Sequence, residues 1–227
     1  ILFGQHFKIL EIIPKWIYIK IGIDNYEGWI CNKQFLEITY KDYKEYDMNN
    51  FPMVGEKFTL IQSLKSSDIF PIPIGSILPY LDNGIFRIKN EKFKFSGVLA
   101  SKNKKDVIKY AKYFLKSPYL WGGKSILGID CSGFTQLVYS LAGINILRDA
   151  NQQAEMGEKI SFKNIMPCDL MFFKNKDNKI IHVGIVLKNN RIIHSSGEVR
   201  IDQFNENGII NKNKLTHKLN SIRRLIN

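Results

Sequence analysis

Cys131 stands where the chain could activate a cysteine nucleophile. Its motif Asp-Cys-Ser-Gly-Phe, residues 130–134, follows a glycine-containing run at 119–123, and an apolar-periodic stretch at 136–143 ends on glycine. This pattern predicts a turn that leads into a helix with Cys131 in the first helical turn. Free backbone N–H groups and the helix dipole gather at that position, so we expect them to stabilise a thiolate and to lower the pKa of the thiol.

Two histidines could supply the base that such a thiol needs. His182 lies 51 residues after Cys131 in an apolar run at 180–187, and His194 lies in a second run at 191–197. The three residues between the runs predict a hairpin of two antiparallel strands. Adjacent strands would place the two imidazoles side by side. We therefore expect His182 to take the thiol proton and His194 to orient the ring of His182.

Simpler interpretations of the same residues exist. A lone buried cysteine is more often a small hydrophobic residue, and a histidine in an apolar run is more often a hydrogen-bonded core residue. Zinc binding is a further alternative, but one cysteine and two histidines without a close second pair form a weak zinc pattern, and we expect no metal and no other cofactor. The order of a helix-start cysteine followed by histidines on consecutive strands favours catalysis.

These residues form part of a larger set of motifs that resembles the NlpC-type bacterial cell-wall cysteine peptidases. The motifs are Tyr-x-Trp-Gly-Gly at 119–123, Asp-Cys-Ser-Gly-Phe at 130–134, Arg-Asp-Ala-x-Gln-Gln at 148–153, Asp-Leu-x-Phe-Phe at 169–173, His-Val-Gly-Ile at 182–185 and His-Ser-Ser-Gly at 194–197. The resemblance covers residues 103–227. It implies a papain-like catalytic domain, helices packed on an antiparallel sheet, with Cys131 as nucleophile, His182 as general base and His194 as third member of the triad.

Two side observations accompany this resemblance. The family usually has glycine where Cys168 stands, so we expect a turn there with a little backbone strain. We expect Arg148, Gln152 and Gln153 to order the loop after the helix, and we assign no role to His6 or His217.

The first hundred residues have a different pattern. Short β-type runs at 7–10, 16–19, 26–30 and 58–61 alternate with turn residues, which predicts small all-β barrels. The run Tyr-Glu-Gly-Trp at 26–29 resembles the bacterial SH3-like modules that accompany these peptidases. We expect one module at 1–42 with an incomplete start, a polar linker at 40–47 and a second module at 43–100. The catalytic domain would occupy 101–227, opening with a helix that Asn103 caps, and the fold class would be α+β.

The resemblance also implies a substrate site. In related enzymes the SH3-like module closes one end of the cleft, where acidic residues bind the free amino terminus of the substrate. A buried ammonium group needs carboxylate and hydroxyl acceptors, since an unpaired charge would be prohibitive there. The residues implied for substrate binding are Asp130, Ser132, Tyr119, Trp121 and Glu27.

A closed cleft of this kind admits two residues ahead of the bond that is cut. The expected reaction is therefore hydrolysis of the peptidoglycan stem peptide L-Ala-γ-D-Glu-diamino acid after the γ-linked D-glutamate, in the recycling of wall fragments. The expected partners are stem peptides or muropeptide fragments, and we expect the Cys131 backbone N–H to meet the oxyanion formed on attack.

Composition limits the other classes of protein. The net charge of +12 could indicate a nucleic-acid partner, but the lysines are scattered instead of clustered with aromatic residues, so we expect none. No apolar run reaches 18 residues, which argues against a membrane span. Three widely spaced cysteines argue against a disulfide framework, so we expect Cys31 and Cys168 to remain thiols. We expect a monomer in the cytoplasm or, if an N-terminal signal has been removed, in the periplasm or cell envelope.

Three alternative functions remain open at this point. The first is a wall-binding protein with an inactive peptidase domain, against which the intact order of cysteine and histidines argues. The second is a basic small-barrel nucleic-acid binder, which would need clustered cations around exposed aromatic residues. The third is a papain-like acyltransferase that passes the acyl group to an acceptor other than water.

Overall fold

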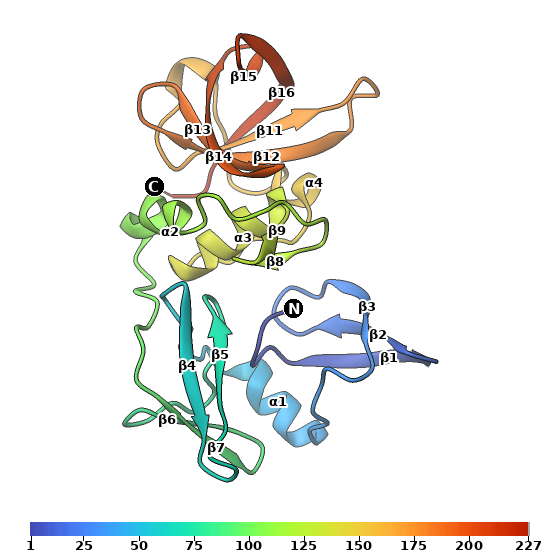
Figure 1. Ribbon diagram of the computed structural model, residues 1–227. Helices are drawn as coiled ribbons and strands as arrows, with labels where there is room; N and C mark the ends of the chain where they lie inside the picture. Colours follow the sequence, from blue (N-terminus) through green and yellow to red (C-terminus); the bar gives the residue numbers. More distant parts are fainter. Residues whose placement is uncertain (227) are drawn as a thin grey trace. The chain divides into compact units, whose positions relative to one another are not determined.

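The computed structural model describes residues 1–226 and divides the chain into two compact units, Ile1–Ala100 and Ser101–Asn227 (Figure 1). The first unit is rich in β-structure, and the second combines helices with a large antiparallel sheet, so the fold class is α+β. Among the described residues, no helix has both the length and the apolar character needed to cross a membrane.

The first unit begins with a three-stranded antiparallel sheet. Its strands are β1 (Phe7–Ile13), β2 (Trp16–Ile21) and β3 (Glu27–Cys31), in the order β1-β2-β3. Ile17, Ile19 and Ile21 of β2 are buried together, because alternate side chains of a strand point to the same face. The β-type runs expected at 7–10, 16–19 and 26–30 are thus confirmed.

A helix occupies the segment that the sequence pattern indicated as a linker. Helix α1 (Tyr40–Met48) begins with a capping box, in which the Thr39 side chain accepts from the Asp42 N–H and the Asp42 side chain accepts from the Thr39 N–H. Its buried residues are Tyr43 and Tyr46. The segment between the two sheets is therefore helical, and the module boundary expected between residues 42 and 43 falls inside this helix.

The first unit ends with a four-stranded sheet in the order β5-β4-β7-β6. Its strands are β4 (Phe58–Ser63), β5 (Ile69–Pro73), β6 (Ile85–Ile88) and β7 (Glu91–Phe95). Apolar side chains around Phe86 and Phe93, whose rings stack at 5.1 Å, form its core. The turn before β6 has positive φ at Asn83 and Gly84, which asparagine and glycine tolerate best.

The second unit opens with short helices and a hairpin. Asn103 caps the 3-10 helix η1, as expected, through a hydrogen bond from the Lys105 N–H to its side chain. The elements that follow are η1 (Lys104–Asp106), α2 (Val107–Tyr113), β8 (Lys124–Ser125), β9 (Gly128–Ile129), α3 (Cys131–Leu141) and α4 (Ala150–Gln153). Helix α3 has Cys131 in its first turn and closes near Gly143, at a φ of 83°, so the predicted helix is confirmed.

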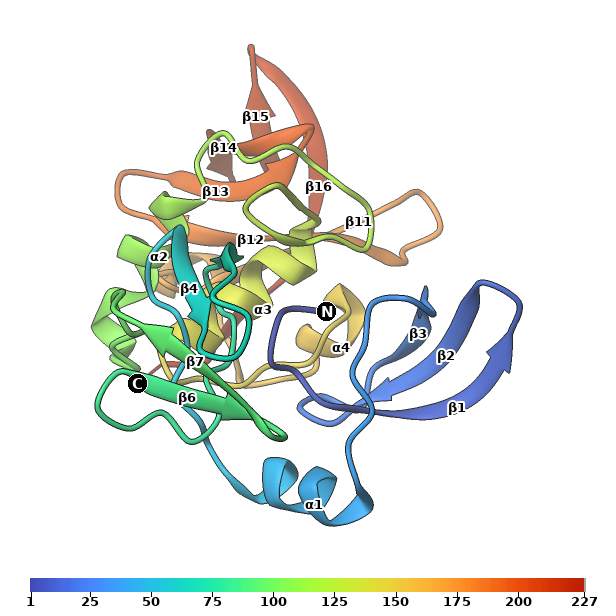
Figure 2. The ribbon, with the colours of Figure 1, turned by 60° about the horizontal axis from the view of Figure 1, so that its bottom comes forward.

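The rest of the second unit is a seven-stranded antiparallel sheet in the order β10-β16-β11-β12-β13-β14-β15. Its elements are β10 (Glu158–Lys159), η2 (Phe162–Asn164), β11 (Leu170–Lys174), β12 (Ile180–Leu187), β13 (Arg191–Ser196), β14 (Glu198–Asn205), β15 (Gly208–Asn211) and β16 (Lys214–Arg224). The long strand β16 pairs with β15 through its first half and with β11 through its second half. Strands β11–β16 therefore close into a ring (Figures 1 and 2).

Strands β12 and β13 pack against a helix on one face and against an apolar core on the other. Helix α3 packs on β12 and β13 from one side. On the other side, inside the ring, Met171, Phe173, Val186 and further apolar residues form a core. Alternation along β12 puts His182 and Gly184 on the same face as Val186. A Cβ at Gly184 would lie 2.9 Å from the Cβ of His194, so this strand position needs glycine to leave room for the second imidazole.

Cys168, just before β11, has a φ of 73°, which confirms the strained turn expected where the family usually has glycine. We predict that Cys168→Gly stabilises the protein. Relief of the left-handed conformation gives about 1–2 kcal/mol, and the added flexibility of the unfolded chain costs about 0.5–1 kcal/mol. The net gain of up to about 1.5 kcal/mol should raise the melting temperature by up to about 6 °C in calorimetry. Cys168→Ala is the control, because it keeps the Cβ and the strain; an equal gain in the alanine variant would contradict the argument.

Candidate active site

The Cys131 thiol lies at the start of α3, against strand β12. The residue is 8% exposed. The backbone N–H of Val183 hydrogen-bonds to its sulfur, and the backbone N–H groups of Ser132 and Cys131 itself are also directed at it. Val183 is the immediate neighbour of His182. The packing of α3 on β12 therefore brings the predicted nucleophile to the strand residue beside the predicted base.

The two predicted histidines form a chain of hydrogen-bond contacts with an aspartate. His182 Nε2 lies 2.8 Å from His194 Nδ1, and His194 Nε2 lies 3.0 Å from Asp202 Oδ2. The exposed fractions of these three residues are only 5%, 0% and 8%. The expectation that consecutive strands set the two imidazoles side by side is confirmed.

Asp202 on β14 is held by two further donors. Arg200 Nε lies 2.9 Å from Oδ2, and Asn211 Nδ2 donates to Oδ1 at 2.8 Å. Burial by itself raises the pKa of Asp202, but the hydrogen bonds from His194, Asn211 and Arg200 outweigh it and hold the pKa well below its usual range. The aspartate is therefore ionised at neutral pH.

A third histidine covers the ring of His182. His217 on β16 stacks on it with ring centroids 4.3 Å apart and an interplanar angle of 28°, and its Nδ1 lies 2.9 Å from Thr216 Oγ1. Burial, with smaller contributions from His194 and Arg200, lowers the pKa of His217 to about 4. The sequence pattern had assigned no role to His217, and the structure places it in direct contact with the predicted base.

The pKa of the Cys131 thiol is shifted in the direction opposite to the expected one. Burial, followed by the negative charge of Asp130, raises the pKa of the Cys131 thiol to about 11, although the N–H groups at the helix start lower it. Burial also lowers the pKa of His182 well below its usual value, with help from His194, His217 and Arg200. The predicted lowering of the thiol pKa is therefore wrong for the resting site, because desolvation outweighs the helix terminus. Thiol and imidazole are both neutral there.

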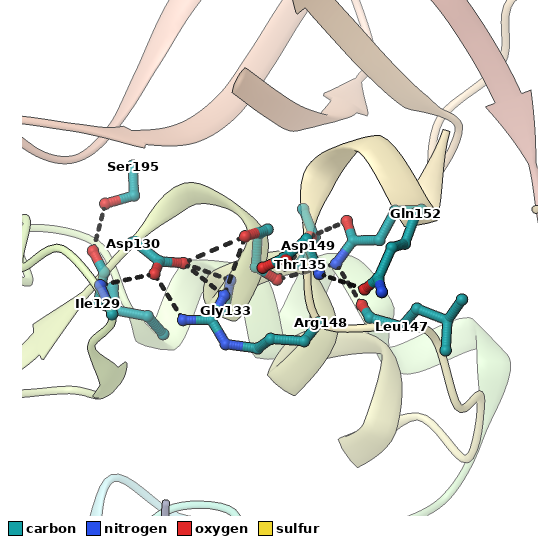
Figure 3. A network of polar contacts seen from close by, with 12 residues as sticks. Ile129, Asp130, Gly133, Thr135, Leu147, Arg148, Asp149, Gln152 and Ser195 are labelled. Carbon is teal, nitrogen blue, oxygen red and sulfur yellow. Dashed lines mark hydrogen bonds and ion pairs between the residues drawn. The ribbon is translucent and has the colours of Figure 1, made fainter. Parts of the chain in front are cut away.

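Asp130, the residue before the cysteine, is bound to Arg148 in a buried ion pair (Figure 3). The guanidinium lies 3.0 Å from Oδ1 and 2.5 Å from Oδ2. The Gly133 N–H donates to Oδ1 at 2.6 Å and the Gly122 N–H to Oδ2 at 2.9 Å. These donors hold the carboxylate in place, so the structure gives Asp130 the task of fixing the helix start. Its contact with a substrate ammonium stays a prediction.

The loop after α3 is ordered by the residues expected to do so (Figure 3). Arg148 donates to Ser132 Oγ at 2.9 Å in addition to its bonds to Asp130. Gln153 is fully buried, accepts from the Thr135 hydroxyl at 2.7 Å and donates to the Leu147 carbonyl at 2.8 Å. Gln152 completes a capping box with Asp149. These bonds tie α4 to the first turn of α3.

The remaining predicted substrate residues have distinct surroundings. Tyr119 is 38% exposed, and its pKa is raised by burial and then by Cys131 and Asp130, so its hydroxyl lies within electrostatic reach of both. Trp121 is 86% exposed. Glu27 belongs to the first unit, where it accepts from the Tyr18 hydroxyl and from Lys20, each at 3.2 Å.

Three residues of the site, Arg200, Asp202 and Asn211, had no predicted role. The alternation of β14 indicates that Arg200 and Asp202 point to the same face as Phe204, a residue of the ring core. Burial of a charged side chain inside the ring costs free energy unless the charge is paired. The contact with His194 on the neighbouring strand β13 follows only from the register, in which His194 is opposite Arg200.

The fold and the site define the class of protein. A helix-start cysteine packed on a strand that carries paired histidines is the arrangement of an α+β cysteine peptidase. Residues 116–218 match the NlpC/P60 family. The match covers most of the second unit, and the chain is an enzyme of the cysteine peptidase type.

Individual relatives are similar over most of the chain. The gamma-D-glutamyl-L-lysine dipeptidyl-peptidase of Bacillus subtilis (strain 168) is 28% identical over 214 residues, which are 86% of this chain and 71% of that protein. Dipeptidyl-peptidase 6 of Lysinibacillus sphaericus is 25% identical over 91% of this chain and 83% of its own length. The crystal structure of an NlpC/P60 family protein from Bacillus cereus ATCC 10987 matches with a TM-score of 0.79 at 23% identity, over 99% of this chain and 80% of that one. This last likeness concerns the fold alone.

Because the Cys131 thiol is neutral in the resting site, we predict that its reactivity depends on pH. In a Cys31→Ser, Cys168→Gly background, where Cys131 is the remaining cysteine, alkylation by iodoacetamide requires ionisation of a thiol whose pKa is raised to about 11. The second-order rate, followed by mass spectrometry, should rise about tenfold for each pH unit between neutral pH and pH 10, because the thiolate fraction rises by that factor below the pKa. The same background with Cys131→Ala should remain unlabelled. A rate that is already constant from pH 6 upward would show a preformed thiolate and contradict the neutral site.

Proposed function

We propose that this chain hydrolyses peptidoglycan stem peptides and cuts L-Ala-γ-D-Glu-diamino acid after the γ-linked D-glutamate, with a free amino group on the L-alanine. The observation that carries the proposal is the position of the Cys131 thiol against Val183, the strand residue next to His182, whose Nε2 lies 2.8 Å from His194 Nδ1. The names of the relatives support the substrate class, since a relative in Bacillus subtilis and one in Bacillus cereus are each named gamma-D-glutamyl-L-lysine dipeptidyl-peptidase. The released dipeptide would make the enzyme part of wall-fragment recycling.

The proposed reaction uses three groups of the site. His182 takes the proton of the Cys131 thiol as the sulfur attacks the carbonyl carbon of D-glutamate, so that proton transfer accompanies attack on a neutral thiol. The Cys131 N–H at the helix start donates to the developing oxyanion. The C–N bond then breaks, the amine leaves with the proton from His182, and water hydrolyses the thioester by the reverse sequence of proton transfers.

The proposed specificity depends on acceptors for the substrate ammonium. We assign this task to Glu27, Asp130 and the hydroxyls of Tyr119 and Ser132, with Trp121 as an apolar contact. Glu27 is the cleanest group to test, because it is partly exposed and its partners Tyr18 and Lys20 also lie at the surface of the first unit. The proposal includes a papain-like fold for the second unit and SH3-like modules in the first.

Our first functional prediction concerns the nucleophile and the base. Cys131→Ala and His182→Ala should each abolish release of L-Ala-γ-D-Glu from the free tripeptide, measured by liquid chromatography, because each removes a group that takes part in bond formation. Cys168→Ala is the matched control and should keep activity, since that thiol lies outside the site. An active Cys131→Ala variant would refute the assignment, and a peptide product joined to an added amine in place of water would indicate an acyltransferase.

Our second functional prediction concerns the substrate's amino group. Acetylation of L-Ala-γ-D-Glu-diamino acid removes the positive charge and adds bulk, and a buried charged contact left unpaired costs about 2–5 kcal/mol. The blocked peptide should therefore have a kcat/KM lower by about tens to thousands of times.

The matched variant for this prediction is Glu27→Gln. It should lower kcat/KM for the free peptide and leave the value for the acetylated peptide unchanged. Both comparisons should be made with L-lysine and with meso-diaminopimelate as the third residue. Equal rates on free and blocked peptides would leave a general stem-peptide hydrolase.

A further inference from the structure

We infer that Asp202 is a positioning residue of this active site, which fixes the tautomers of two successive imidazoles so that Nδ1 of His182 is the nitrogen that accepts the thiol proton. The inference rests on the proposed roles of Cys131 and His182. It adds a fourth residue, which Arg200 and Asn211 hold in place, to the predicted cysteine and the two predicted histidines.

The first step is the charge of Asp202. Its carboxylate receives three donors, from His194, Arg200 and Asn211, within 3.0 Å. A carboxylate with such partners stays ionised, and an ionised carboxylate only accepts hydrogen bonds. His194 Nε2, 3.0 Å from Oδ2, must therefore carry a hydrogen and donate it.

The second step follows from the chemistry of a neutral imidazole, which has one donor and one acceptor nitrogen. Burial keeps both rings neutral, because it lowers the pKa of His182 and of His194. With Nε2 of His194 protonated, its Nδ1 is the acceptor. The atom 2.8 Å away, His182 Nε2, must then be the donor, which leaves a lone pair on His182 Nδ1.

The third step concerns the positive charge that appears on His182 during attack. Arg200 is the cation nearest to this network, and it lowers the pKa of both His182 and His194. Asp202 pairs with Arg200 at 2.9 Å and so counters its effect on the imidazoles. The other groups that face His182 are His217 on β16 and Phe173 on β11, and neither carries charge at neutral pH.

The experiment compares the parent with Asp202→Asn and reads the tautomers directly. ¹⁵N spectra of histidine-labelled parent protein should show hydrogen on Nε2 of both His182 and His194. Asparagine can donate to His194 Nε2 as well as accept, so the variant should show hydrogen on Nδ1 of His182 in a substantial population. Its kcat on the free tripeptide should fall by up to about 10⁴, the loss found when a triad loses its orienting carboxylate, while KM stays unchanged. Asp202→Glu should recover part of kcat, and Asp202→Asn with Arg200→Gln should recover some activity by removing the uncompensated cation.

Asp169→Asn is the matched control. Asp169 is another buried carboxylate with an arginine partner, Arg224 at 2.8 Å. This variant should lose thermal stability but keep the histidine tautomers and kcat. Hydrogen on Nδ1 of His182 in the parent, or an Asp202→Asn variant with unchanged tautomers and kcat, would overturn the inference. Should Cys131→Ala stay active, the proposed function fails, yet the parent spectrum still decides the inference about Asp202.

Discussion

The contact between the Cys131 thiol and the backbone of Val183 joins the two halves of this active site. The cysteine belongs to a helix and the histidines to a sheet, so their distance depends on how α3 packs on β12. Two sets of interactions fix that packing from opposite ends. The Asp130–Arg148 ion pair holds the helix start, and the closed ring of β11–β16 holds the strands. The proposed catalysis needs both, because the helix start holds the cysteine and the ring of strands holds the histidines.

Burial gives this site its chemical character. The cysteine, both histidines and both aspartates are each at most 8% exposed. Desolvation favours neutral forms, which is why the thiol and His182 rest uncharged. Each of the two aspartates is held by an arginine and further donors. The aspartates therefore position the site, and in the proposed reaction the proton passes between the neutral thiol and the neutral imidazole.

Much of this arrangement could be predicted from local patterns. The helix from Cys131, the hairpin that carries His182 and His194, and the turn at Cys168 all follow from residue types within a few positions of one another. Helix α1 was missed although its capping box, Thr39 with Asp42, is also local. The family resemblance predicted the enzyme class correctly, because several short motifs in the expected order support one another.

Local motifs in the sequence predict which residues carry the chemistry: a cysteine at a helix start and two histidines on adjacent strands. Only the tertiary structure decided how these groups are charged and what supports them. The direction of the thiol pKa depends on desolvation, a sum over all neighbours, which a helix-terminus argument leaves out. Asp202 reaches His194 through the register of β13 and β14, whereas His217 reaches His182 because β16 pairs with both β15 and β11 and closes the ring. Closure is set by pairings between residues far apart in the chain, and no local pattern records them.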